Sequence, residues 1–119
     1  MTFRLLSLAA ACLLLMAGCR KPNSVVLGNA PTGKPQTISS VKTEKVQTPV
    51  TLQGVMIEKC PVAGCWFRLR DRTGEIKVDT KLAGFVVLDV PLESRLTVAG
   101  KKALSESGEI TIEATGVRY

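Results

Sequence analysis

A two-residue periodicity runs from Val50 to Tyr119 and leaves few folds open to this chain. Apolar and polar residues alternate there in short runs, which is typical of strands with one buried face and one solvated face. Two connections, residues 71–74 and 105–108, end in glycine and suit β-hairpins. The pattern predicts an all-β domain with five strands, over residues 50–59, 66–70, 75–79, 95–103 and 109–118.

Two places depart from this alternation. Gly54 separates two apolar sets of opposite parity within the first strand and predicts a bulge or bend there. The connection from Lys81 to Ser94 is long, and Pro91 ends any regular element that precedes it. We interpret the apolar run from Phe85 to Leu88 within it either as a short buried strand or as a cap over one end of a barrel.

Five strands with a long connection between the third and the fourth predict a small closed barrel. The segment Trp66–Ile76, with the sequence WFRLRDRTGEI, resembles the F-x-L-x-D-x-T-G-x-I hairpin of OB-fold domains related to the tRNA-anticodon-binding type. The resemblance implies a small five-stranded OB-like barrel over residues 50–119, with a ligand face that borders the connection between the first two strands. A small sandwich or an SH3-like barrel is the alternative.

The N-terminal segment has the organisation of an export signal. One positive charge, Arg4, precedes thirteen mostly apolar residues from Leu5 to Ala17, fewer than the roughly 20 that span a bilayer. The run Leu15–Cys19 (LMAGC) resembles the lipobox of bacterial lipoproteins. The resemblance implies a signal peptide over residues 1–18 and a membrane anchor of acyl chains such as palmitate on Cys19. An ordinary signal peptide, or a simple N-terminal anchor with Cys19 unmodified, is the alternative.

The lipobox resemblance also implies a location and a domain organisation. A lipid-anchored product lies in the bacterial cell envelope and faces the periplasm. Arg20 stands where an aspartate would favour the inner membrane, so the outer membrane is favoured in a Gram-negative cell. Residues 19–49 are rich in Pro, Gly, Asn, Ser and Thr, and we expect them to form the lipidated N-terminus and a flexible linker. Residues 50–119 then form the folded domain.

The positive charge of the chain lies mostly outside this domain. The formal net charge is +6. Residues 1–49 hold six Lys or Arg against one Glu, whereas residues 50–119 hold ten Lys or Arg against nine Asp or Glu. A domain charge of +1 argues against nucleic acid as a partner. Basic residues beside a lipid anchor instead suit an anionic membrane surface.

Four cysteines and no histidine limit the chemistry open to the chain. There is no serine–histidine–acid triad, no His-containing zinc site and no carboxylate pair spaced for acid–base catalysis, so we expect neither an enzyme nor a cofactor. Cys12 would leave with the signal, which leaves Cys60 and Cys65 in an oxidising compartment. We expect a structural disulfide between them. The alternatives are a redox-active pair, a Cu(I) site with Met56 as a third ligand, and two inert thiols.

The strand face beside the cysteine pair carries the candidate ligand-binding residues. They are Trp66, Arg68, Arg70 and Lys77. An exposed tryptophan beside cations stacks on a sugar ring, a base or an aromatic side chain of a partner. In the alternative interpretation, Trp66 packs against the disulfide or a barrel end, while the arginines pair with Glu75 and Asp79 across the hairpin.

These features together predict a non-catalytic binding or assembly module held at a membrane through Cys19. We expect its partner to be an envelope protein, a glycan or a small ligand. Two alternatives stay open, a thiol redox or Cu(I)-handling factor that uses Cys60 and Cys65, and an oligonucleotide-binding OB domain. The run Gly64–Trp66 (GCW) resembles an element of small exported bacterial proteins of unassigned function and does not decide between them.

Overall fold

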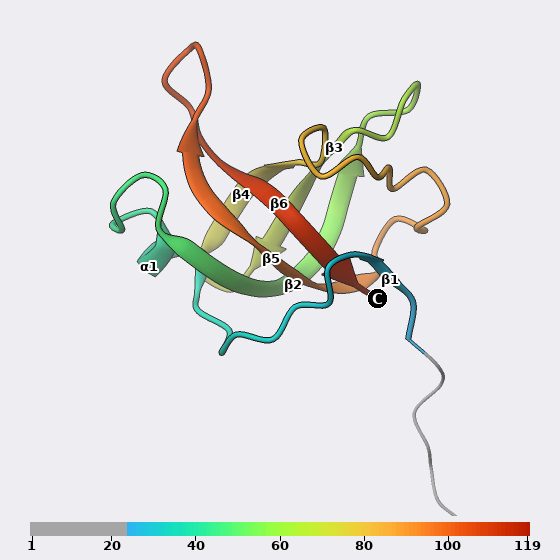
Figure 1. Cartoon of the computed structure of the whole chain (residues 1–119), viewed down its shortest axis with the longest axis horizontal. Helices are drawn as coiled ribbons and strands as arrows, with labels where there is room; N and C mark the ends of the chain where they lie inside the picture. The colour runs from blue at the N-terminus through green and yellow to red at the C-terminus, as the bar shows by residue number, and fades with distance from the viewer. Residues whose placement is uncertain (1–23) are drawn as a thin grey trace, which may run out of the picture.

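The computed structural model describes residues 24–119, so the predicted signal peptide and Cys19 lie outside the described residues. The regular secondary structure of these residues is almost entirely β (Figure 1). Its elements are β1 (Val26–Gly28), α1 (Ile38–Val41), β2 (Pro49–Lys59), β3 (Trp66–Asp71), β4 (Gly74–Asp79), β5 (Arg95–Leu104) and β6 (Ile110–Arg118). Among residues 24–119, no helix is long and apolar enough to span a membrane.

Five of the strands form a closed barrel. β2, β3 and β4 follow one another as antiparallel neighbours, and β4 pairs with β6 in parallel. β5 pairs antiparallel with both β6 and β2, which closes the ring (Figure 1). The prediction of a small five-stranded OB-like barrel is therefore confirmed, with each strand within one or two residues of its expected bounds.

The alternation in the sequence sets the inside and the outside of the barrel. Along β3, Phe67 and Leu69 are fully buried, whereas Arg68 is half-buried and Arg70 is exposed on the outer face. Apolar side chains from β2, β3, β4, β5 and β6 meet in one core cluster. Burial of this apolar surface, rather than any helix, supplies the main driving force for folding.

The irregularity predicted at Gly54 lies slightly further along β2. The register between β2 and β3 shifts between Met56 and Glu58, which places the bulge there. Gly54 instead marks a close approach of the two strands, because a Cβ atom at this position would overlap the carbonyl oxygen of Arg70.

The connection between β4 and β5 forms a cap on the core, as one of the two interpretations predicted. It contains no strand, yet Val87 and Val90 are fully buried. Lys59, at the end of β2, donates from Nζ to the carbonyl oxygens of Leu88 at 2.7 Å and Val90 at 2.5 Å. This ammonium group, together with backbone hydrogen bonds to β2 and to the loop between β2 and β3, holds this connection, which we call the cap loop (residues 80–94).

Residues 24–49 belong to the fold, in contrast to the flexible linker expected from their composition. β1 pairs with the C-terminal half of β6, and the Arg118 guanidinium donates to the carbonyl oxygen of Pro31 at 2.6 Å. α1 adds Ile38 and Val41, both fully buried, to the barrel core. With three and four residues, β1 and α1 are too short to give a periodic signal, which is why the composition was misleading.

Candidate functional site

Three of the four predicted ligand-face residues lie together on the outer surface of β3 and β4. Arg68 lies directly opposite Lys77 across the two strands. Lys77 Nζ lies 4.9 Å from the centroid of the Trp66 ring, which is within cation–π range. Trp66 and Lys77 are both half-buried. The ammonium group thus orients the indole while part of the ring stays accessible, and we call these three residues the Trp66 face.

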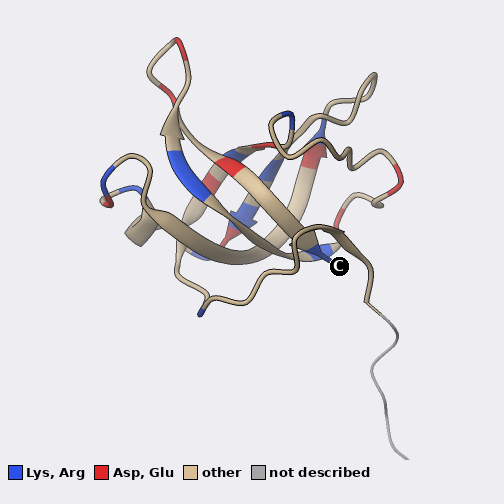
Figure 2. Cartoon of the chain, in the orientation of Figure 1, with Lys and Arg blue, Asp and Glu red and all other residues tan. Residues whose placement is uncertain are grey.

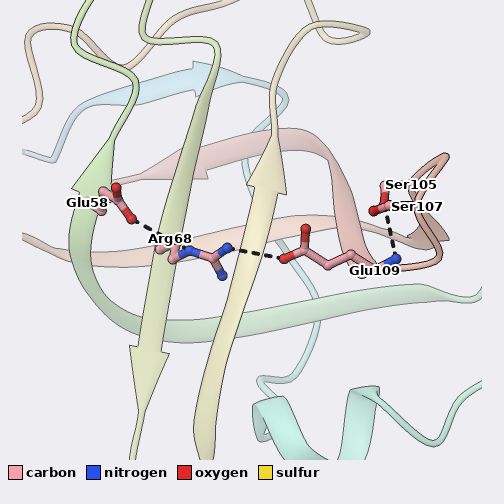
Figure 3. A network of polar contacts seen from close by, with 5 residues as sticks. All are labelled: Glu58, Arg68, Ser105, Ser107 and Glu109. Atoms are coloured by element: carbon pink, nitrogen blue, oxygen red, sulfur yellow. Dashed lines mark hydrogen bonds and ion pairs between the residues drawn. The ribbon is translucent and has the colours of Figure 1, made fainter.

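Arg68 is tied into a network of carboxylates on this face (Figure 3). Its Nη2 lies 3.2 Å from Glu109 Oε2, and its Nε lies 3.6 Å from Glu58 Oε1. The backbone N–H of Glu109 donates to the hydroxyl of Ser105 in the β5–β6 turn at 3.0 Å, which fixes this part of the turn. The arginine is therefore neutralised by two acids.

The acids that pair with Arg68 are not the two that the sequence suggested, Glu75 and Asp79 across the hairpin. Among residues 24–119, neither Glu75 nor Asp79 forms an ion pair with an arginine, and Asp79 instead lies 3.7 Å from Lys81 Nζ. Glu109 reaches Arg68 from the turn before β6, a contact that the barrel closure creates. The alternation of residues along one hairpin cannot predict a contact with a strand that lies elsewhere in the sequence.

Figure 2 shows both acidic and basic residues on the barrel strands. The two signs are mixed on the Trp66 face, because Arg68 and Lys77 lie among Glu58, Glu109 and Asp79. A surface that binds a polyanion needs an excess of unpaired cations. The Trp66 face has no such excess.

Arg70, the fourth predicted residue, lies apart from this cluster. It lies at the opposite end of β3 from Trp66, is exposed, and lines a separate cleft together with Arg72 and Arg95. Neither Arg72 nor Arg95 was singled out by the sequence, because they belong to a turn and to a different strand.

The predicted disulfide is not formed. Cys60 and Cys65 are both free, half-buried thiols. The six residues 60–65, which we call the cysteine loop, make a compact turn in which Gly64 N–H donates to the Cys60 carbonyl oxygen at 3.0 Å. The Cys65 carbonyl oxygen accepts from Thr80 N–H at 2.9 Å, which holds this end of the loop against the cap loop without a covalent bond.

The turn makes one of the two thiols acidic. Ala63 N–H donates to Cys60 Sγ at 3.5 Å. This hydrogen bond, with further ones from the backbone amides of Val62 and Gly64, lowers the pKa of Cys60 to about 7. A substantial fraction of Cys60 is therefore thiolate near neutral pH.

The cysteine loop is held rigidly on the cap loop. Val87 N–H donates to the carbonyl oxygen of Gly64 at 2.8 Å. Gly64 has a φ of +63°, and a Cβ atom there would lie 2.7 Å from Leu88 Cγ, so only glycine suits both the conformation and the space. The tip residue Val62 remains 86% exposed. The cysteine loop, which leads into Trp66 at the start of β3, thus presents an exposed apolar tip.

The described residues offer little for a metal ion. Within residues 24–119, no three His, Cys, Asp or Glu side chains lie close enough to form a ligand set. Met56, considered as a third Cu(I) ligand, is fully buried in the barrel core. A Cu(I) site here would rest on the two thiols of the cysteine loop alone.

Comparison with known proteins agrees with this architecture. A solved structure, described as that of the hypothetical protein ygiW from E. coli, is similar to this chain with a TM-score of 0.56 and 22% sequence identity, over 73% of this chain and 90% of its own length. At that identity the similarity bears on the fold. No curated protein matches the chain.

The sequence model of a family described as "Bacterial OB fold (BOF) protein" matches residues 16–118. The match includes the segment with β1 and α1, in agreement with its place in the fold. The narrower resemblance of Trp66–Ile76 to the tRNA-anticodon-binding type stays a prediction. Since the family model matches residues 16–118 and the barrel topology of the described residues agrees with it, this protein belongs to the bacterial OB fold family.

Proposed function

We propose that this protein is a non-catalytic binding module whose ligand contacts the Trp66 face and the cysteine loop. The observation that carries the proposal is the position of Trp66, which is half-buried, oriented by Lys77 and joined to the base of the cysteine loop, where the Cys60 N–H donates to the Trp66 carbonyl oxygen at 3.1 Å. OB-fold barrels bind their ligands with strand faces and adjoining loops. A rigid aromatic ring beside a fixed loop supplies contact area at little entropic cost.

The charge balance of the Trp66 face indicates the chemistry of the ligand. Arg68 is neutralised by Glu58 and Glu109, and Lys77 is engaged by the indole ring. A polyanion such as single-stranded nucleic acid would have to displace both carboxylates from Arg68. A glycan or a protein surface, which can use the indole ring and the existing pattern of donors and acceptors, suits this face better.

The anchoring of this module belongs to the same proposal. The lipobox-like run Leu15–Cys19 supports cleavage before Cys19 and acylation of that residue, which would place the module at a membrane of the bacterial envelope. Metabolic labelling with a palmitate analogue tests this directly. The full-length chain incorporates the label and the Cys19→Ser variant does not, whereas an unlabelled wild-type chain would refute the anchor.

Photocrosslinking tests the ligand-binding surface. A photoreactive benzoylphenylalanine is placed at Val62, on the tip of the cysteine loop, and in a matched variant at Val46, which is also exposed but lies between α1 and β2. In cells that make the full-length chain, the probe at Val62 gives a discrete adduct and the probe at Val46 does not. Equal adducts from both positions, or none from Val62, would contradict the proposal. Glycosidase and protease digestion of the adduct then separates glycan from protein.

A thiol function is the second candidate, and the acidity of Cys60 favours it. A thiol with a pKa of about 7 is a better nucleophile and metal ligand at neutral pH than an ordinary cysteine. Stoichiometric uptake of Cu(I) by the reduced chain, lost in both Cys60→Ser and Cys65→Ser, would support it. A reduction potential well above that of structural disulfides would support a redox role instead.

A further inference from the structure

A second surface of the barrel gathers arginines that the Trp66 face does not use. An open cleft of about 590 Å³ is lined by residues of β2, β3 and β5, by the turn that follows β3, and by residues 35–37. Three of the lining residues are Arg70, Arg72 and Arg95. The cleft lies at the end of β3 that is opposite to Trp66 and the cysteine loop.

The sheet register explains why two of these arginines meet. Val55 of β2 is paired with Arg70 of β3 on one side and with Arg95 of β5 on the other. Directly paired residues of neighbouring strands have their side chains on the same face of the sheet. Arg70 and Arg95 therefore flank Val55 on the outside of the barrel, and Arg72 joins them from the turn.

These guanidinium groups lack partners within the described part of the chain. All three are exposed, and among residues 24–119 the ion pairs are formed by Arg68 and Lys81 instead. Glu75 lies opposite Arg70 on β4, but no ion pair joins the two. The one acid among the lining residues, Asp71, has both carboxylate oxygens bound by its own turn and by α1.

We propose that this cleft binds an oxyanion, a carboxylate or phosphate group carried by a small ligand. Each guanidinium offers a planar fork of N–H donors that matches the two oxygens of such a group. Three arginines against one engaged aspartate leave an excess of positive charge in the cleft. The site shares no residue with the Trp66 face, so its test does not depend on the proposed function.

Nuclear magnetic resonance titration of the full-length chain in nonionic detergent tests the site. The ¹⁵N-labelled chain is titrated with sodium phosphate and, separately, with sodium succinate, with chloride keeping the ionic strength constant. We expect saturable shifts of the backbone amides of Arg70, Arg72 and Arg95. If only phosphate saturates the site, the ligand carries a phosphate group. If only succinate does, it carries a carboxylate group. Saturation by both assigns an oxyanion site that accepts either group.

Matched variants separate the site from general charge effects. The double variant Arg70→Gln/Arg95→Gln weakens binding by about tenfold or more, because two charge-assisted contacts are removed. Lys101→Gln, which removes an exposed positive charge outside the cleft, leaves the affinity within about twofold. The single variants Arg70→Gln and Arg95→Gln provide the same comparison if the double variant does not fold. Absence of saturation with both anions, or equal weakening by Lys101→Gln, would overturn the proposal.

Discussion

Single polar side chains hold the parts of this protein that strand pairing does not reach. Lys59 binds two carbonyl oxygens of the cap loop. Lys102, only 6% exposed, donates from Nζ to the carbonyl oxygens of Lys42 at 2.7 Å and Glu44 at 2.6 Å. Each of these cations satisfies carbonyl groups outside the strand ladders and so joins a loop to the barrel through charge-assisted hydrogen bonds.

Asp71 likewise joins separate segments, but as a negatively charged acceptor of hydrogen bonds. Its Oδ2 accepts from the N–H of Ile38 at the start of α1 at 2.8 Å, and its Oδ1 accepts from the N–H and the hydroxyl of Thr73 at 2.7 Å and 2.6 Å. Burial alone would raise the pKa of Asp71. The hydrogen bonds from the Thr73 hydroxyl and from the Ile38 and Thr73 amides outweigh it, so the pKa lies below its ordinary value.

Replacement of Asp71 therefore tests whether this carboxylate joins α1 to the β3–β4 hairpin. We expect Asp71→Asn to lower the free energy of unfolding by about 1–2 kcal/mol at pH 7, because the amide cannot accept all three hydrogen bonds. Chemical denaturation measures the change. Asp89→Asn, at an exposed position of the cap loop, is the control and should be nearly neutral.

The pH dependence of the same variant has a defined sign. Because the folded-state pKa of Asp71 is lowered, its stabilising contribution is complete above the ordinary carboxyl pKa of about 3.9 and is lost as the pH falls through the folded-state value. The stability difference between wild type and Asp71→Asn should thus shrink in acid. A difference that stays constant from pH 7 to below pH 3 would contradict the account.

Cys60 provides a test by reactivity. With a pKa of about 7, its alkylation by iodoacetamide should accelerate from pH 5.5 to pH 8.5 with a midpoint near pH 7. The measurement uses the Cys65→Ser variant, so that Cys60 is the one thiol left within residues 24–119. Peptide mass spectrometry monitors the alkylation of Cys60. A midpoint near the ordinary cysteine value would show that the backbone amides of the turn do not stabilise the thiolate.

At the scale of elements, the short pieces outside the barrel are integral to its core. α1 has only four residues, yet Ile38 and Val41 are fully buried. The side chain of Thr37 accepts from Ser40 N–H at 3.2 Å and caps this turn of helix. So short a helix has little stability of its own, and it exists because the barrel covers its apolar residues.

Truncation of Ile38 measures this contribution. Ile38→Ala should lower the free energy of unfolding by about 2–5 kcal/mol, because it removes a buried side chain and leaves a cavity in the core. Ser39→Ala, at the neighbouring exposed position, should change it by less than about 0.5 kcal/mol. Equal and small effects of the two variants, in thermal or chemical denaturation, would show that residues 24–49 do not pack as described.

The barrel was predictable from sequence because its strands are long enough to alternate. Phe67 and Leu69, two residues apart, identify the inner face of β3, and the glycines of the turns mark where strands end. β1 and α1 were not predictable, because they are too short for a periodic signal and their apolar residues are buried only against the closed barrel. For the cap loop the sequence left two interpretations open, a short buried strand or a cap, and the structure shows the cap. The partners of Lys59, Lys102 and Arg68 were likewise hidden, since they come from segments far apart in the chain.

The candidate site likewise contains a part that the sequence predicts and a part that depends on the three-dimensional fold. Trp66, Arg68 and Lys77 come together because they share one face of one hairpin, which parity predicts. The disulfide was expected from spacing and compartment alone, and the hydrogen bonds of the cysteine loop show how this turn is held without it. Arg95 entered the second cleft through β5, which only the three-dimensional register reveals.

At the scale of the whole molecule, the closed barrel separates two chemically different surfaces. The Trp66 face, at the end with the cysteine loop, is aromatic and balanced in charge. The cleft at the other end of β3 carries three exposed arginines that form no ion pair among residues 24–119. The barrel keeps these two surfaces apart at opposite ends of β3, and the two proposed sites therefore differ in charge.

The central claim is that Trp66 serves recognition and not the core. Trp66→Ala in the full-length chain with the photoreactive residue at Val62 tests it, because stability and adduct yield are then read from one protein. The account predicts a loss of at most about 1–2 kcal/mol in the free energy of unfolding, as expected for a half-buried ring with one cation–π contact, together with disappearance of the adduct. An undiminished adduct, or a loss of stability of the size seen for buried aromatic residues, would contradict it.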